Sequence, residues 1–372
     1  MKVGIPKEVK DHEYRVGATP AMVKALVKGG HTVMVQKGAG SKIGFEDEDY
    51  KKAGAQIVER PELVYEAEMV IKVKEPQPNE YPLLKENQIL FCYLHLAPDP
   101  KQTEALLKQK VVGIAFETVT DCKGRLPLLT PMSEVAGRIS IHAGANSLHM
   151  AAGGRGTLLG GVPGVAPGKV VIIGGGVVGT QAAKMARGLG ADVTILDSNL
   201  DRLRELDDLF EGRLKTLYST PVTIEEELSS CDIVVGAVLI PGKLTPKLIT
   251  KDIVKKMRHG SVIVDVAIDQ GGCAETSRPT THSDPIFVQD NVVHYCVANM
   301  PGACARTATI ALTNSVLPFA LKLAEKGYKE ALLQDPHLLD GLNVCLGKVT
   351  NEHVAHDLNY AFHPPKEVLS SL

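Results

Sequence analysis

The chain of 372 residues lacks the features that define several classes of protein. Basic and acidic residues nearly balance, 41 against 43, so no positive excess predicts a nucleic-acid partner and no block of like charge predicts a tail. The longest apolar runs, such as VVIIGGGVVG, are short and broken by glycine, which argues against a membrane span. The N-terminus, MKVGIPKEVKDHEYR, lacks the apolar stretch of a signal peptide. We therefore expect a soluble, cytoplasmic protein with neither a nucleic-acid nor a membrane partner.

Paired cysteines are also missing. The seven cysteines are odd in number and form no CxxC pair, and several lie inside apolar runs such as LFCYL and VVHYCVAN. Buried thiols in a reducing compartment explain this pattern better than disulfides do. We predict no metal site. Internal repeats and low-complexity tracts are absent too, and the length suits two domains better than one.

What the sequence does contain is an alternation of short β-rich runs with helical patterns. In TPAMVKALVKGG, Thr19 suits a helix N-cap, Pro20 suits the first helical position, and Gly29 and Gly30 suit the helix end. Strand-like runs such as HTVMVQ, MVIKVKEP, QILFCYLHLA and VVGIAFE flank helical stretches. Helices between strands of this kind predict a doubly wound α/β sheet.

The alternation restarts in the second part of the chain. A long helical stretch at about 131–151 and a glycine-rich loop precede KVVIIGG, DVTILD, DIVVGAV, SVIVDVA and VVHYCVAN. TATIALTNSVLPFALKLAEKG then predicts a long helix, and we expect the last 65 or so residues to be strand-free and to pack back on the first domain. The prediction is an α/β protein of two doubly wound Rossmann-like domains, separated by a cleft and linked by long helices. One domain comprises 1–130 plus 305–372, and the other 131–304.

A dinucleotide-binding fingerprint is present in GKVVIIGGGVVGTQAAKMARGLGADVTILD. A β-branched strand leads into Gly174, Gly176 and Gly179, which would permit a tight turn, close approach of the pyrophosphate and close helix packing. The helix N-terminus, with Val177 and Val178, would face the negative charge of the phosphates. We expect the helix to present one apolar face, made of Val178, Ala182, Met185 and Leu189.

The second strand of the fingerprint ends in Asp197. A carboxylate there would accept hydrogen bonds from the adenine ribose and repel a 2′-phosphate, which favours NAD over NADP. Arg202 lies close by in the sequence and keeps NADP open, because an arginine can pair with phosphate. Three later strands end in GAVLIPG, DVAIDQGG and CVANMPG. Since ligands bind beyond the carboxyl ends of parallel strands, the residues predicted to line the nicotinamide side are Val238, Leu239, Asp269, Asn299 and Met300.

The sequence closely resembles the alanine dehydrogenase family through most of its length. The matching stretches include GIPKEVKDHEYRVGATP, GAGSKIGFEDEDYKKAGA, IKVKEP, LFCYLHLA, FETV, PMSEVAGR, the fingerprint and DVAIDQGGC. The soluble component of nicotinamide nucleotide transhydrogenase shares several of them. The resemblance implies reversible oxidative deamination of L-alanine by NAD, through iminopyruvate, to pyruvate and ammonium, and a homohexamer as the assembly.

The resemblance also implies roles for individual residues. Arg15 and Lys74 would anchor the substrate, and His95 and Asp269 would be catalytic. Ser133, Ser219 and Arg278 would contact the cofactor, on resemblance alone.

Each of these residues also has a simpler interpretation. Arg15 lies in a loop of mixed charge, where a solvated arginine is the usual case. Lys72 and Lys74 share one face of a strand, and that face could simply be half-solvated. The alternation of apolar and polar residues does not show which lysine would bind the substrate. A histidine among apolar residues, such as His95, is more often a hydrogen-bonded core residue, and an aspartate before glycine, such as Asp269, is commonly a turn residue.

Two other functions use the same motifs. A transhydrogenase-like subunit would pass hydride between nicotinamides and need a membrane partner. A non-enzymatic NAD-sensing module would use domain closure to regulate a partner, and it would have no use for Arg15, Lys74 and His95 in one place.

Overall fold

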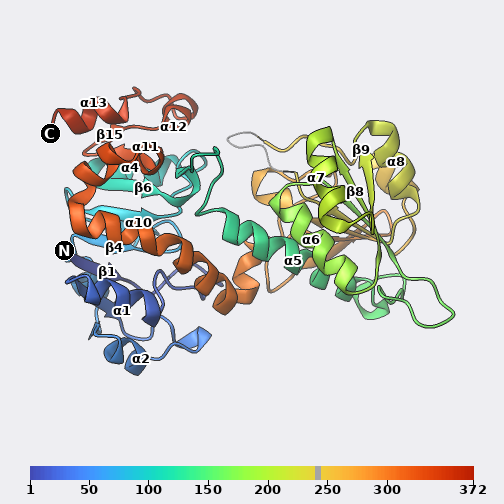
Figure 1. Ribbon diagram of the computed structural model, residues 1–372, viewed down its shortest axis with the longest axis horizontal. Helices are drawn as coiled ribbons and strands as arrows, with labels where there is room; N and C mark the ends of the chain where they lie inside the picture. The colour runs from blue at the N-terminus through green and yellow to red at the C-terminus, as the bar shows by residue number, and fades with distance from the viewer. Residues whose placement is uncertain (239–243) are drawn as a thin grey trace. The chain divides into compact units, whose positions relative to one another are not determined.

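The computed structural model describes residues 1–238 and 244–372, and Figure 1 shows the chain from end to end. The chain divides into two compact units. Unit 1 comprises Met1–Met132 and Cys304–Leu372, and unit 2 comprises Ser133–Ala303. The chain leaves unit 1 within helix α5 (Thr130–Ser147) and returns within the 3-10 turn η6 (Met300–Cys304). Each unit contains one sheet with helices, which confirms the predicted α/β class.

The eight-stranded sheet of unit 1 has the order β15-β14-β6-β5-β4-β1-β2-β3. Read from β3, the first six strands follow the 3-2-1-4-5-6 order of a Rossmann fold, and all six are parallel. The strand order reverses between β1 and β4, which is where such sheets bind ligands. The six strands are β1 (Lys2–Ile5), β2 (Thr32–Gln36), β3 (Gln56–Val58), β4 (Met69–Ile71), β5 (Ile89–Cys92) and β6 (Val112–Ala115).

The helices of unit 1 begin where the sequence provides caps. Helix α1 (Pro20–Lys28) starts after Thr19, whose hydroxyl accepts a hydrogen bond from the Met22 amide at 3.3 Å, as predicted. Its buried residues face the sheet, and α10 lies beside it in Figure 1. The other helices before unit 2 are α2 (Asp47–Lys52), α3 (Pro61–Val64) and α4 (Pro100–Lys108).

The C-terminal segment returns to unit 1, as predicted, but the expectation that it is strand-free is wrong. β14 (Leu342–Cys345) pairs antiparallel with β6, and β15 (Lys348–Val349) pairs with β14. All four residues of β14 are buried, including Asn343, whose amide donates to the Gly341 carbonyl at 2.9 Å and to Thr118 Oγ1 at 2.7 Å. Because a polar residue interrupts this short run, its hydropathy gave no strand signal. The helices of the segment are α10 (Ala305–Gln334), α11 (Pro336–Leu339), α12 (Glu352–Asp357) and α13 (Pro365–Ser370).

Among the described residues, one helical segment, Met300–Gln334, is long and apolar enough to cross a membrane by length and composition. This is weak support for a membrane span, because the core helix of a soluble protein passes the same test. Its helix α10 packs against α1, α11 and α13 of unit 1 and buries residues such as Leu312, Val316 and Leu323.

The seven-stranded sheet of unit 2 has the order β12-β13-β11-β10-β7-β8-β9. Read from β9 to β13 it is again 3-2-1-4-5-6, all parallel, with β12 added antiparallel at the edge. The strands are β7 (Lys169–Ile173), β8 (Asp192–Asp197), β9 (Lys215–Tyr218), β10 (Ile233–Gly236), β11 (Val262–Asp265), β12 (Ile286–Gln289) and β13 (Val292–Tyr295). The remaining helices are α6 (Val177–Gly188), α7 (Leu200–Phe210), α8 (Pro221–Ser229) and α9 (Lys251–Lys256).

Two smaller expectations were tested by burial. Helix α6 buries Val178 and Ala182 as predicted, but Leu189 is 43% exposed because the helix ends at Gly188 before that position can turn inward. All seven cysteines are free; five are buried as interpreted, but Cys122 and Cys304 are exposed.

Candidate active site

The topology of unit 1 gathers four polar side chains at the carboxyl ends of neighbouring strands. Arg15 follows β1, Lys74 follows β4, His95 follows β5 and Glu117 follows β6, and these strands are adjacent in the order β6-β5-β4-β1. The set includes both strands at which the strand order reverses. Parallel sheets of this kind bind ligands here, so the position supports a small-molecule site.

Arg15 is buried, not solvated as the charge of its loop suggested. Its side chain is 2% exposed and makes a two-bond pair with Glu13, Nε to Oε1 at 2.7 Å and Nη2 to Oε2 at 2.6 Å. Nη1 donates to the thioether sulfur of Met132 at 3.1 Å, which is a weak acceptor. A fixed guanidinium can bind a carboxylate through charge-assisted hydrogen bonds.

Glu13 is the group that sequence reasoning missed beside Arg15. Burial alone would raise the pKa of this carboxyl, but the hydrogen bonds and charge of Arg15, with a contribution from Lys74, hold the pKa below its ordinary value. Glu13 is therefore an anion that lies among two cations. Lys74, which is half-buried, belongs to the same electrostatic cluster as Arg15.

The structure distinguishes the two lysines that alternation could not. Lys72 is fully buried and donates to Glu8 Oε2 at 3.1 Å and to Glu80 Oε1 at 2.8 Å, so a half-solvated strand face is wrong for this residue. Glu8 Oε1 also accepts from the Val73 amide at 2.7 Å. Lys72 is thus occupied by internal partners, and it holds in place the segment that presents Lys74.

His95 is not a core residue. Its strand ends at Cys92, and the imidazole, 44% exposed, follows on a segment with a left-handed backbone, φ 47°. The ring stacks on Tyr93 with centroids 5.9 Å apart and an interplanar angle of 13°. Tyr93 is buried and donates to the Leu128 carbonyl at 2.6 Å.

Tyr93 also connects His95 to the cationic cluster. Burial raises the pKa of its phenol, and the Arg15 guanidinium acts against this, which places the two side chains within electrostatic range of each other. Arg15, Lys74 and His95 are thereby linked inside unit 1, through Glu13 on one side and Tyr93 on the other. A site with two cations and an accessible imidazole suits a small carboxylic acid that undergoes proton transfer.

In unit 2, the glycine loop after β7 has the geometry that a pyrophosphate requires. Gly174 has φ 102°, a conformation that favours glycine, and a Cβ on Gly179 would lie 1.8 Å from the Gly174 carbonyl oxygen. Gly176, the N-cap of α6, has open space where its Cβ would be. The amides of Val177 and Val178 lie in the first turn of the helix. This open N-terminus fits an NAD pyrophosphate, because a side chain at Gly176 would fill the approach.

Asp197, at the end of β8, lies against the same loop. Its Oδ2 accepts from the Gly175 amide at 2.6 Å, and its backbone carbonyl accepts from the Ser219 amide at 3.0 Å. Arg202 is tied to the loop as well, with Nε donating to the Gly175 carbonyl at 2.7 Å and Nη2 to Thr180 Oγ1 at 2.7 Å. Arg202 therefore braces the turn, which weakens the argument that it is set aside for a 2′-phosphate.

The residues predicted for the nicotinamide side follow β10, β11 and β13. Val238 is half-buried after β10, and Leu239 lies outside the described residues. Asp269 is exposed in the 3-10 turn η5 (Val266–Gln270) after β11. Asn299 is half-buried with φ 61°, and Met300 is buried. The four described residues follow carboxyl ends of parallel strands.

Of the three positions predicted by resemblance alone, Ser219 bonds to Asp197 through its backbone amide, and the other two have modest surroundings. Ser133 is half-buried in α5. Arg278 is exposed, and its guanidinium lies 4.1 Å from the ring centroid of Phe287. Neither arrangement by itself identifies a cofactor contact.

Asp265, at the end of β11, is a further carboxylate that the sequence did not single out. It is completely buried, and its Oδ2 accepts from the Cys273 amide at 2.9 Å, the Ala274 amide at 3.2 Å and the Ser277 hydroxyl at 2.6 Å. These bonds close the turn that carries Asp269. Only the position directly after an apolar strand could have indicated Asp265.

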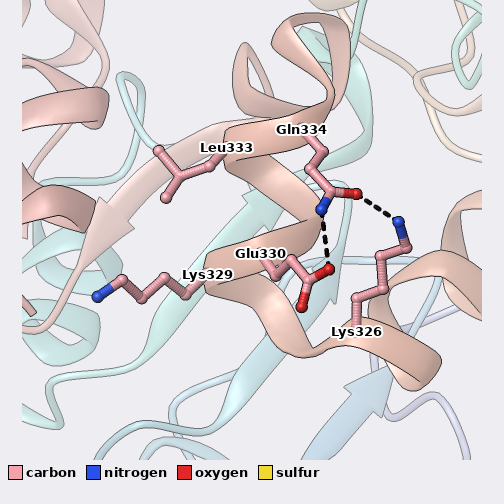
Figure 2. A pocket seen from close by; sticks show the side chains of 5 residues that line it. All are labelled: Lys326, Lys329, Glu330, Leu333 and Gln334. Carbon is pink, nitrogen blue, oxygen red and sulfur yellow. Dashed lines mark hydrogen bonds between the residues drawn. The ribbon is translucent and has the colours of Figure 1, made fainter.

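Figure 2 shows a pocket on the surface of α10 that differs in kind from these sites. Its lining residues all come from one helix, and they bond mainly to each other; Gln334 donates to Glu330 at 2.8 Å and accepts from Lys326. None of the residues predicted for catalysis or cofactor binding lines it. The residues that line it are Lys326, Lys329, Glu330, Leu333 and Gln334.

Two Rossmann-type units, one with a dinucleotide loop and one with a cationic cluster beside an imidazole, define a two-domain NAD-dependent oxidoreductase. Family models identify it further: "Alanine dehydrogenase/PNT, N-terminal domain" matches residues 4–136 and "Alanine dehydrogenase/PNT, C-terminal domain" matches 140–352. The chain belongs to the alanine dehydrogenase/PNT family.

Individual relatives agree with this assignment. Alanine dehydrogenase 2 of Staphylococcus aureus (strain USA300) is 56% identical over 99% of this chain and 100% of its own length. Alanine dehydrogenase of Halomonas elongata is 55% identical over 95% and 96%. A solved structure of L-alanine dehydrogenase, 52% identical, superimposes with a TM-score of 0.94 over 96% of this chain and 99% of that one. A transhydrogenase from Sinorhizobium meliloti, 22% identical, shares the fold with a TM-score of 0.83 over 94% and 100%.

Proposed function

We propose that the protein is an NAD-dependent alanine dehydrogenase that catalyses the reversible oxidative deamination of L-alanine to pyruvate and ammonium. The full-length relatives named alanine dehydrogenase support the activity. The observation that carries the site assignment is the cluster at the carboxyl ends of β1, β4 and β5, where the buried Arg15 and the half-buried Lys74 share the Glu13 carboxylate. His95 belongs to the same cluster through Tyr93.

The residues that would hold NAD are those of the glycine loop and Asp197. Gly174, Gly176 and Gly179 leave the N-terminus of α6 open to the pyrophosphate, and the carboxylate of Asp197 suits the adenine ribose hydroxyls. Since Asp197 already accepts a hydrogen bond from the loop, its charge is fixed where a 2′-phosphate would be repelled. When bound, NAD would accept the hydride that leaves the alanine Cα.

In unit 1, Arg15 and Lys74 would bind the carboxylate of alanine and, in the reverse direction, the carbonyl oxygen of pyruvate. Arg15 offers a guanidinium whose geometry is fixed by Glu13, and a carboxylate would bind it through charge-assisted hydrogen bonds. His95 would transfer protons between the attacking water and the nitrogen on the imine carbon. Asp269 would orient water or ammonia. Closing the site to water would strengthen each of these charge contacts.

A steady-state assay of purified protein tests the activity. We expect NADH formation from NAD with L-alanine at alkaline pH, and little with other L-amino acids. Arg15→Lys should raise KM for alanine by about 10- to 100-fold, because a lysine cannot form the two-bond pair with Glu13 and still offer a fixed edge. His95→Ala should lose turnover but retain NAD binding and thermal stability. Absence of NADH with every amino acid would refute the proposal.

We also propose a cytoplasmic homohexamer, which rests on the family resemblance alone. Light scattering coupled to size-exclusion chromatography measures the assembly directly. A hexamer has six times the protomer mass of 39.8 kDa. A monomer or dimer at micromolar concentration would contradict the proposal.

A further inference from the structure

Glu117 lies where it can control His95. It follows β6 in the 3-10 turn η3 (Phe116–Thr118), one strand away from β5, and its side chain is 17% exposed. Oε1 accepts from the His95 amide at 2.7 Å and from the Leu94 amide at 3.1 Å, and Oε2 lies 3.2 Å from the Leu94 amide. One carboxylate therefore binds two successive backbone donors directly before the imidazole.

These bonds hold His95 in an unfavourable backbone conformation. A left-handed φ of 47° is uncommon for a non-glycine residue and persists where surrounding contacts impose it. The stacking on Tyr93 fixes the plane of the ring at the same time. Backbone and ring are both held, so the direction of the imidazole is determined.

The same carboxylate also faces one edge of the ring. His95 Nδ1 lies 4.0 Å from Glu117 Oε1, too far for a hydrogen bond but close for a charge. An ionised carboxylate only accepts hydrogen bonds, so it favours an N–H on the ring nitrogen that faces it. Nε2 belongs to the opposite edge of the ring, and the ring is 44% exposed.

We propose that Glu117 is a positioning residue for the reaction: it selects the tautomer of His95 with hydrogen on Nδ1 and so leaves Nε2 as the proton acceptor. This inference rests on the proposed function. As water forms a C–O bond to the iminium carbon, the C=N electron pair moves to nitrogen and the water proton goes to Nε2. The resulting imidazolium faces the Glu117 carboxylate and gives its proton to the amine nitrogen of the adduct. The C–N bond then breaks, its electron pair leaves with ammonia, an oxygen electron pair forms the C=O bond of pyruvate, and the hydroxyl proton goes to Nε2.

Glu117→Gln separates this role from simple anchoring. The amide oxygen still accepts from both backbone amides and still lies nearest Nδ1, but the negative charge that favours hydrogen on Nδ1 is lost. We expect kcat to fall about 10- to 100-fold. KM for alanine and the Kd for NAD should stay within about twofold of wild type, and the thermal midpoint within about 2 °C. Glu86→Gln is the matched control, because Glu86 is 65% exposed, pairs only with Lys110 at 3.2 Å and lies outside the site.

A chemical probe reports the tautomer without turnover. The ring nitrogen that carries no hydrogen reacts with diethyl pyrocarbonate. Peptide mass spectrometry follows this reaction at His95. At alkaline pH, we expect reaction at His95 to be several-fold slower in Glu117→Gln than in wild type or Glu86→Gln, because without the carboxylate charge a larger share of the rings carries hydrogen on Nε2. Glu117→Asp keeps the carboxylate and should retain the wild-type rate even if the shorter side chain lowers the thermal midpoint.

The outcomes separate the inference from the proposed function. An unchanged kcat with unchanged modification of His95 in Glu117→Gln would overturn the inference. The inference would also be overturned if the thermal midpoint and kcat fell together, KM for alanine rose, and the modification rate of His95 stayed unchanged. That result would show that Glu117 only holds the loop. If wild type forms no NADH from alanine, the proposed function fails, and the probe still decides the tautomer.

Discussion

Replacing Lys72 by methionine should destabilise unit 1 strongly, although methionine fills nearly the same volume. The ammonium is fully buried between Glu8 and Glu80, whose side chains are 2% and 5% exposed. Tyr65 donates to Glu80 Oε1 at 2.7 Å, so this oxygen accepts two bonds, and the site contains two carboxylates for one cation. Without Lys72, both carboxylates stay buried without the cation that bonds to them.

The size of the loss follows from the desolvation of these charges. Breaking a buried ion pair by removing one partner costs about 3–5 kcal/mol, which corresponds to a drop of about 6–20 °C in the thermal midpoint for a domain of this size. Burial already raises the pKa of Glu8, and Lys72 acts against that rise. In the variant the pKa of Glu8 rises further, so the folded state binds a proton more readily than the unfolded state. The gap to wild type should therefore narrow as the pH falls from 8 towards 5.

Thermal and urea unfolding at pH 8 and pH 5.5 measure both effects. Lys37→Met is the matched control, because the Lys37–Glu59 pair at 2.8 Å is exposed and such pairs contribute about 0–1 kcal/mol. The triple variant Lys72→Met, Glu8→Gln, Glu80→Gln should recover much of the stability, since it removes the stranded charges together with the cation. A loss below about 1 kcal/mol in Lys72→Met, or one that does not depend on pH, would refute the reasoning.

Three further predictions concern unit 2. Asp197→Ala should raise KM for NAD about tenfold or more and reduce discrimination against NADP, measured by steady-state kinetics with both cofactors; unchanged discrimination would contradict the role of Asp197. Gly176→Ala should keep the wild-type thermal midpoint but bind NAD less tightly, measured by calorimetry. Gly179→Ala should lower the thermal midpoint, because its Cβ would meet the Gly174 carbonyl oxygen. Equal thermal midpoints in the two variants would contradict this prediction. Burial lowers the pKa of His294 below its ordinary value, so its contribution to stability is complete above about pH 6.5 and is lost as the pH falls below that. His294→Gln should therefore lose less midpoint than wild type between pH 8 and 5.5.

Sequence patterns predicted the elements that carry local signals. The cap of α1, the strand before Gly174 and the glycine loop each depend on residues within a few positions of one another, and all three are confirmed. β14 was missed because its four residues include a buried asparagine, and its pairing partner β6 lies far away in the chain. A short strand added at a sheet edge is specified by that partner more than by its own composition.

The carboxylates of the candidate site were missed for a related reason. Glutamates are mostly exposed, so nothing in the composition distinguishes Glu13 or Glu117 from a surface residue. Glu117 is bonded to an amide 22 residues away, and Glu8 to an amide 65 residues away, so only the strand order brings these groups together. One signal was available. Glu117 lies two residues after the end of an apolar strand and His95 lies three after another, and strand ends are where this fold places ligand groups.

Arg15, Lys74 and His95 of the candidate site share one arrangement, in which each lies near a carboxylate of unit 1. Arg15 bonds to Glu13, Lys74 acts on the same carboxylate, and His95 faces Glu117. Such counter-ions reduce the cost of burying positive charge before a substrate binds, and they fix the geometry of the donors. They also limit affinity for the substrate carboxylate, because part of the positive charge is already neutralised. In such a site the substrate binds less tightly, but the groups that bind it are already oriented. This combination favours turnover over tight binding of a small acid.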